Sequence, residues 1–112
     1  MSGRPQLPEV SAAEVSDEAF LLDVREPDEW AAGHAPGAHH VPMMQLLARL
    51  DEVPQDRDVV VVCRVGSRSA QVVAYLQANG WSRTSNLHGG MYAWQAAGRP
   101  MTTEDGRTAH VL

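Results

Sequence analysis

The single cysteine of the chain, Cys63, lies in a segment whose residue types could ionise its thiol. The segment Cys63–Ser69 reads Cys-Arg-Val-Gly-Ser-Arg-Ser. Gly66 permits a tight turn that points successive N–H groups inward, and a helix that begins here adds its partial positive charge. Arg64 and Arg68 supply two further positive charges. Because such surroundings lower the pKa of a thiol, the segment predicts a thiolate nucleophile above which small anions collect.

The simpler interpretation of Cys63 is a buried core cysteine, which is common at the end of a strand. We favour the reactive interpretation because burying two arginines beside an inert thiol costs free energy and gains no structural contact. Ser67 and Ser69 add hydroxyl groups that can cap the following helix.

Two buried strands and a helix are expected to position this segment. Phe20–Val24 is an apolar run closed by charge, and Asp58–Cys63 contains four consecutive valines, which is typical of an interior strand covered on both faces. Ser69–Asn79 predicts a helix, since Val72, Val73, Tyr75 and Leu76 recur at helical spacing. Cys63 then follows the clearest strand, at the edge where parallel sheets bind ligands.

The rest of the chain predicts further short elements. Ser11 with Glu14 indicates a capping box for a short helix, and Leu46, Leu47 and Leu50 indicate one face of another. We also expect a helix from Pro27 to Gly33, strands at 38–41 and 84–87, and a last helix at 91–97. Strands that alternate with helices predict an α/β fold with a mainly parallel sheet and helices on both faces.

Bulk properties limit the function classes. We expect residues 1–8 to form a tail, 9–100 one domain, and 101–112 a tail or a strap over the surface. The net charge of −5 argues against nucleic acid as the main partner and against a polybasic membrane contact. No apolar run reaches the roughly 20 residues of a membrane span, and the first residues lack an apolar signal core. A cytoplasmic location is therefore expected.

Four segments, in order, resemble the motifs of the rhodanese homology family across almost the whole chain. Leu22–Pro27 is similar to the first signature, and Glu29–Ala38 resembles the second, with Ala35 where isoleucine is usual. Cys63–Ser69 matches the active-site loop, and Leu87–Trp94 resembles the closing motif. The resemblance implies a rhodanese-like fold with a central sheet of about five strands.

The resemblance also implies a function. Cys63 would accept a sulfur atom as a persulfide and pass it on, so the chain would be a thiosulfate sulfurtransferase. Thiosulfate or another persulfide donor would supply the sulfur, and a thiol or cyanide would accept it, the thiol including that of a thioredoxin-like protein. No cofactor or metal is expected. The backbone N–H groups of the loop would cradle the persulfide and the donor's anion, and Arg68, with Arg64, would bind that anion. The cradle comprises Arg64, Val65, Gly66, Ser67, Arg68 and Ser69.

The loop has two alternative interpretations besides sulfur transfer. Four residues separate Cys63 from Arg68, whereas related phosphatases use one more, so the ring should fit one sulfur atom better than a phosphate. This disfavours a phosphatase or arsenate reductase. A non-catalytic protein-interaction module is the main alternative, and the complete cysteine loop argues against it. Two arginines in the loop favour thiosulfate over mercaptopyruvate.

Supporting residues are harder to assign. Asp23 and Arg25 follow the first buried strand and could flank the site, although their more ordinary role is to pair with charges and fix loops. We expect Arg25 to pair with Glu26 or Glu29. The five histidines show no metal-ligand spacing with cysteine or carboxylates.

Overall fold

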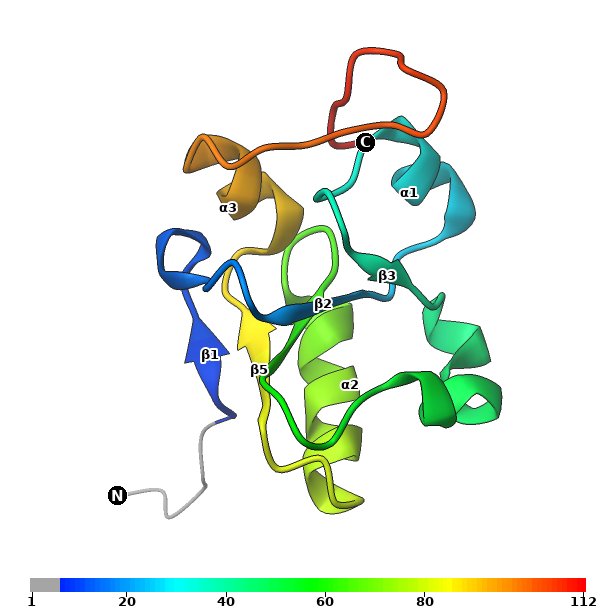
Figure 1. The fold of residues 1–112 in the computed structure, drawn as a ribbon, viewed down its shortest axis with the longest axis vertical. Coiled ribbons are helices and arrows are strands. Elements are labelled where there is room, and N and C mark those ends of the chain that lie inside the picture. The colour runs from blue at the N-terminus through cyan, green and yellow to red at the C-terminus, as the bar shows by residue number, and fades with distance from the viewer. Residues whose placement is uncertain (1–6) are drawn as a thin grey trace.

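The computed structural model describes residues 7–112, so the predicted tail at 1–8 lies largely outside the described residues. Five strands form one sheet in the order β1-β5-β4-β2-β3, and every neighbouring pair is parallel (Figure 1). This confirms the predicted α/β fold. The strands are β1 (Glu9–Val10), β2 (Phe20–Asp23), β3 (His39–His40), β4 (Val59–Val62) and β5 (Thr84–Leu87). The helices are η1 (Ala12–Glu14), α1 (Pro27–Ala32), η2 (Met43–Glu52), α2 (Ser67–Ala78) and α3 (Gly90–Ala96).

Strand β4 is the centre of the core because its four valines are buried on both faces of the sheet. Val59 and Val61 pack with residues of α2 and η2, whereas Val60 and Val62 pack with residues of η1 and α3. This alternation follows from the period of two along a strand. Burying each valine contributes about 1.5–3 kcal/mol, so β4 holds a helical layer on either side. The prediction of an interior strand and of helices on both faces is confirmed.

Strand β1 was not predicted. Glu9 and Val10 pair with Asn86 and Leu87 of β5, and the Pro8 carbonyl accepts the Asn86 N–H at 2.8 Å. A strand of two residues next to a proline carries no periodicity, so only its partner strand defines it.

Two helix predictions were partly wrong. The segment around Leu46 is a 3-10 helix with a kink at Arg49, and Leu47 is 68% exposed while Leu46 is buried, so the two leucines do not share a face. Helix α2 begins at Ser67 rather than Ser69, and Tyr75 is exposed although it belongs to the apolar pattern that predicted the helix. In both helices, the apolar spacing predicted more side chains against the sheet than the sheet covers, since Leu47 and Tyr75 are exposed.

The C-terminal segment after α3 crosses the molecule and lies along α1 (Figure 1). His34 and Thr102 exchange backbone hydrogen bonds of 3.0 and 2.8 Å, and the His110 N–H donates to the Ala32 carbonyl at 2.9 Å. A Cβ placed on Gly33 would lie 2.7 Å from the His110 nitrogen. The close approach of this segment to α1 therefore needs glycine at position 33.

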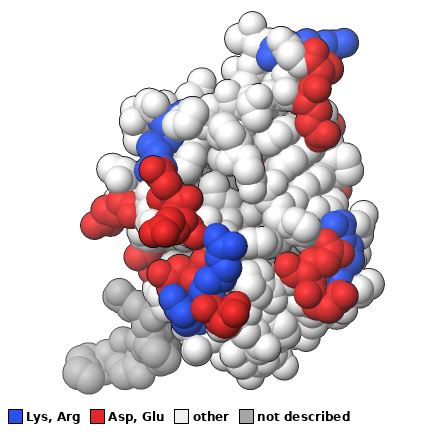
Figure 2. Space-filling view, viewed as in Figure 1, with Lys and Arg blue, Asp and Glu red and all other residues white. Residues whose placement is uncertain are grey.

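On the face shown in Figure 2, basic side chains lie beside acidic ones rather than in a continuous basic surface. Ion pairs of the described residues include Arg49–Glu52 and Arg107–Asp105. Within residues 7–112, no helix has the length and apolar character that crossing a bilayer requires.

Candidate functional site

Cys63 directly follows β4 and precedes α2, at the carboxyl edge of the sheet. The turn between them depends on Gly66, whose φ of +107° lies in the left-handed region that favours glycine. A Cβ on Gly66 would also approach the Gly89 nitrogen to 3.4 Å. The chain can therefore curl around the sulfur and enter α2 within four residues.

Three hydrogen bonds converge on the Cys63 sulfur. The Gly66 N–H donates at 3.1 Å and the Ser69 N–H at 3.3 Å, and the Ser69 hydroxyl lies 3.1 Å away. Burial alone would raise the pKa of Cys63, and this is the largest single effect. The Ser69 hydroxyl and the amides of Ser69, Gly66 and Val65 outweigh it together, so the pKa lies below its ordinary value. The surroundings favour a thiolate.

Helix α3 holds the first residues of the loop from the other side. The Met91 N–H donates to the Cys63 carbonyl at 2.8 Å, and the Tyr92 N–H donates to the Arg64 carbonyl at 3.2 Å. Gly90 permits this contact because its φ is +59° and because it packs directly on the Cys63 and Arg64 backbone. The loop is therefore fixed at its carbonyls by α3 and at its sulfur by α2.

The two arginines of the loop differ in their surroundings. Arg68 donates to both carboxylate oxygens of Glu29, at 2.8 and 2.9 Å. Arg64 is exposed, and its guanidinium lies 5.6 Å from the centre of the Tyr92 ring. Glu29 thus neutralises much of the Arg68 charge, whereas Arg64 has no carboxylate partner among the ion pairs of residues 7–112.

The Glu29–Arg68 pair predicts a pH dependence of stability. Hydrogen bonds from Arg68 lower the pKa of Glu29 from 4.5 to about 2, so the pair stabilises the fold above pH 4.5 and loses this contribution as pH falls towards 2. We expect the free energy of unfolding of Glu29→Gln to fall less over this range than that of the wild type. Urea unfolding at several pH values measures the difference.

Glu52→Gln is a matched control for this prediction. Hydrogen bonds from Arg49 and His39 also lower the pKa of Glu52 to about 2, but its side chain is 32% exposed against 12% for Glu29. Solvent screens the more exposed pair, so Glu52→Gln should change the pH dependence less. Equal changes in the pH dependence of the two variants would contradict a larger contribution from the less exposed Glu29–Arg68 pair.

Asp23 and Arg25 form a buried ion pair with an N–O distance of 2.9 Å. The prediction that Arg25 pairs with Glu26 or Glu29 is therefore wrong, because the fold buries Asp23 against the guanidinium and Glu29 binds Arg68 instead. Arg25 also donates to the Gly33 carbonyl at 2.8 Å, which fixes the end of α1. Neither side chain hydrogen-bonds to the cysteine loop, so both hold α1 and β2 in place.

Two residues that hydrogen-bond to the loop, Glu29 and Asn86, were not predicted as site residues. Glu29 was expected as a partner for Arg25, but its carboxylate binds Arg68, which lies 39 residues away in the sequence. Asn86 lies on β5, and its Oδ1 accepts a hydrogen bond from the Ser69 hydroxyl at 2.5 Å. Asparagine is unfavourable in strands, and this was the one local sign of a role for Asn86.

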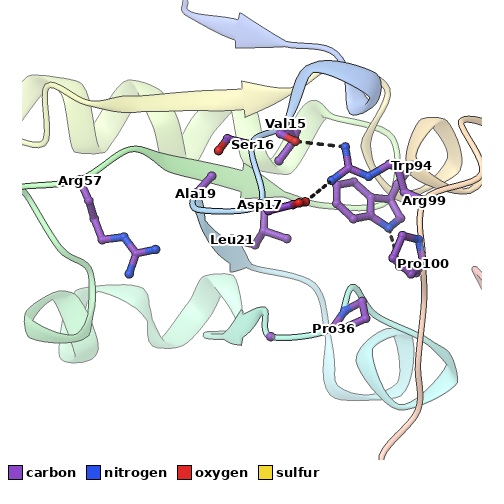
Figure 3. A pocket seen from close by; sticks show the side chains of 11 residues that line it. Val15, Ser16, Asp17, Ala19, Leu21, Pro36, Arg57, Trp94, Arg99 and Pro100 are labelled. Atoms are coloured by element: carbon purple, nitrogen blue, oxygen red, sulfur yellow. Dashed lines mark hydrogen bonds and ion pairs between the residues drawn. The ribbon is translucent and has the colours of Figure 1, made fainter.

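A cavity of about 380 Å³ is lined by residues from the start of β2, by Arg57 just before β4, and by residues at the end of α3 (Figure 3). Arg99 points along its wall, donates to the Val15 carbonyl at 3.1 Å and lies 3.6 Å from Asp17. Its guanidinium also lies 4.5 Å from the centre of the Trp94 ring. Arg99 thus ties η1 to the end of α3, and the cavity is separate from the cysteine loop.

The Cys63 sulfur has no exposed surface in this structure. The two residues that follow it in the loop, Arg64 and Val65, are exposed. Residues 7–112 contain no group of three or more histidine, cysteine or carboxylate side chains placed to hold a metal ion.

Comparisons with known proteins agree with this geometry. Residues 8–97 match the rhodanese-like domain model. A sulfurtransferase from Allochromatium vinosum is 43% identical over 81% of this chain and 85% of its own length. A rhodanese-related protein from Thermoplasma volcanium superposes with a TM-score of 0.81 at 28% identity, covering 87% of this chain and 99% of that one.

A larger protein has the same fold in one part of its chain. A thiosulfate sulfurtransferase from Pseudomonas aeruginosa superposes with a TM-score of 0.77 at 28% identity, over 95% of this chain but only 22% of its own. Together with the matched domain model and the cysteine loop, these relatives show that the chain belongs to the rhodanese-like family of sulfurtransferases.

Proposed function

We propose that this protein transfers a sulfane sulfur from thiosulfate to a thiol through a persulfide on Cys63. The observation that carries the proposal is the convergence of the Gly66 and Ser69 amides on one buried sulfur, with the Ser69 hydroxyl 3.1 Å away. Such donors stabilise the negative charge of the Cys63 thiolate, both when it attacks the donor and when it leaves from the persulfide. A relative that is named a thiosulfate sulfurtransferase supports the choice of donor.

The first half-reaction makes one sulfur–sulfur bond and breaks another. The Cys63 thiolate attacks the outer sulfur of thiosulfate, the bond between the two thiosulfate sulfurs breaks, and sulfite leaves with the bonding electron pair. The negative charge then resides on the outer sulfur of the Cys63 persulfide. The exposed Arg64 would attract the dianionic donor, while Glu29 offsets the charge of Arg68.

The second half-reaction regenerates the enzyme. A thiolate of the acceptor attacks the outer persulfide sulfur, and Cys63 leaves as a thiolate, so no external oxidant or reductant is needed. A protein thiol such as that of a thioredoxin-like partner, a small thiol or cyanide would serve as acceptor. A thiol that must remain reduced suits a reducing compartment, and we place the reaction in the cytoplasm.

A mass measurement tests the proposal. Incubation with thiosulfate followed by intact-mass spectrometry should show the addition of one sulfur atom, and peptide mapping should place it on Cys63. Sulfite should be released in an amount equal to the persulfide formed, and a thiol added afterwards should remove the sulfur from Cys63. A protein that binds partners but never acquires the additional sulfur would instead be an interaction module.

A further inference from the structure

The side chain of Asn86 lies behind the cysteine loop and is 2% exposed. Its Oδ1 accepts a hydrogen bond from the Ser69 hydroxyl, with 2.5 Å between the oxygens. Its Nδ2 donates to the Gly66 carbonyl and to a Glu9 carboxylate oxygen, each at 3.1 Å. Both partners of Nδ2 can only accept a hydrogen bond. The amide orientation is therefore fixed, with Oδ1 towards Ser69.

Asn86 thus contacts both residues that donate to the Cys63 sulfur. Ser69 donates through its amide and lies with its hydroxyl 3.1 Å from the sulfur, and Gly66 donates through its amide at 3.1 Å. Asn86 itself does not touch the sulfur by any hydrogen bond within residues 7–112. Any effect it has on Cys63 passes through these two neighbours.

The Ser69 hydroxyl has a single proton and two neighbours. Asn86 Oδ1 is a buried acceptor whose hydrogen bond in this structure comes from that hydroxyl. While the proton points to Asn86, the hydroxyl oxygen can only accept from Cys63, which requires a protonated thiol. When Cys63 ionises, the thiolate and Asn86 Oδ1 compete for the Ser69 hydroxyl proton. Whichever of the two does not receive this hydrogen bond remains a buried acceptor that lacks it.

We propose that Asn86 is a positioning residue that limits the ionisation of Cys63 by competing for the hydroxyl proton of Ser69. The inference deepens the proposed function, because it assumes that Cys63 is the reacting group. The other charged groups near this chain of contacts are Glu9, which His88 faces at 3.3 Å, and Arg68, which is paired with Glu29. All the variants below leave these groups in place.

The test measures the pKa of the thiol by the pH dependence of its alkylation with iodoacetamide. Cys63 is the only cysteine in the sequence, so the reaction reports on this group alone. Asn86→Ala should free the Ser69 proton for the thiolate and raise the ionisation constant about tenfold, since a hydrogen bond to a charged group is worth that much. In a Ser69→Ala background, the same substitution should have little effect.

Two outcomes would overturn the inference. An equal change in both backgrounds would show that the effect does not pass through Ser69, and a smaller ionisation constant in Asn86→Ala would show that Asn86 assists the thiolate. No sulfur donor is present in this measurement. A failure of sulfur transfer therefore leaves its result unchanged, and the two proposals fail separately.

A control variant separates ionisation from general loss of packing. Thr84 lies two residues before Asn86 on β5, is also buried and hydrogen-bonded, and does not contact the loop by a hydrogen bond. Thr84→Val should lower stability and leave the alkylation profile as in the wild type. If Asn86→Ala does not fold, Asn86→Leu keeps a similar volume and makes the same comparison.

Discussion

Replacing Cys63 by serine should abolish sulfur transfer while leaving the fold intact. The Gly66 and Ser69 amides would donate to the serine oxygen as they do to the sulfur, so the loop keeps these hydrogen bonds. A serine hydroxyl, however, is not ionised near neutral pH, whereas the surroundings lower the pKa of the Cys63 thiol. We expect no added sulfur atom in the mass spectrum of Cys63→Ser and no release of sulfite above the uncatalysed rate.

Ser67→Ala is a suitable comparison because Ser67 lies in the same loop but makes no side-chain hydrogen bond to the sulfur. It should retain most of the wild-type rate of sulfite release. Unfolding in urea should show that Cys63→Ser is folded. An added sulfur atom in the mass of the serine variant, or sulfite release at the wild-type rate, would place the chemistry elsewhere and remove the basis of the proposed function.

The cysteine loop could be predicted from sequence because its signals are local. Four valines in a row predict a central strand, Gly66 predicts the turn, and apolar spacing predicts α2. These features are contiguous in the chain, so each element needs only its own residues to be recognised. The position of Cys63 at the carboxyl edge then follows from the parallel arrangement.

The contacts that adjust the chemistry could not be predicted in this way. Glu29 reaches Arg68 across 39 residues and Asn86 reaches Ser69 across 17, so both contacts exist only once the sheet has formed. The misassigned partner of Arg25 has the same origin, because several carboxylates lie close in sequence and only the fold selects Asp23. Composition shows which charges are present, and packing decides which of them meet.

The contact between α3 and the loop gives a second large prediction, for Gly90→Ala. A Cβ at this position would clash with the Cys63 carbonyl oxygen and lie 2.6 Å from the Arg64 carbonyl carbon, at a φ of +59°. Overpacking costs about 1–3 kcal/mol and a left-handed alanine a further 1–2 kcal/mol. We expect a loss of roughly 2–5 kcal/mol in the free energy of unfolding, measured in urea.

Gly98→Ala provides the matched control. Gly98 also has a left-handed φ, +72°, and lies just beyond the other end of α3, but a Cβ there would meet no atom within 4 Å. It should therefore show only the cost of the backbone conformation, about 1–2 kcal/mol. The difference between the two variants isolates the clash with the loop, and equal losses would contradict it.

The same pair of variants shows whether α3 positions the nucleophile. A Cβ on Gly90 must push α3 away from the Cys63 and Arg64 carbonyls, which accept the Met91 and Tyr92 amides. Moving those carbonyls also moves the sulfur relative to the Gly66 and Ser69 donors. Under conditions where both variants are folded, Gly90→Ala should form persulfide more slowly than Gly98→Ala, because geometry at the reacting sulfur and not stability then limits the rate.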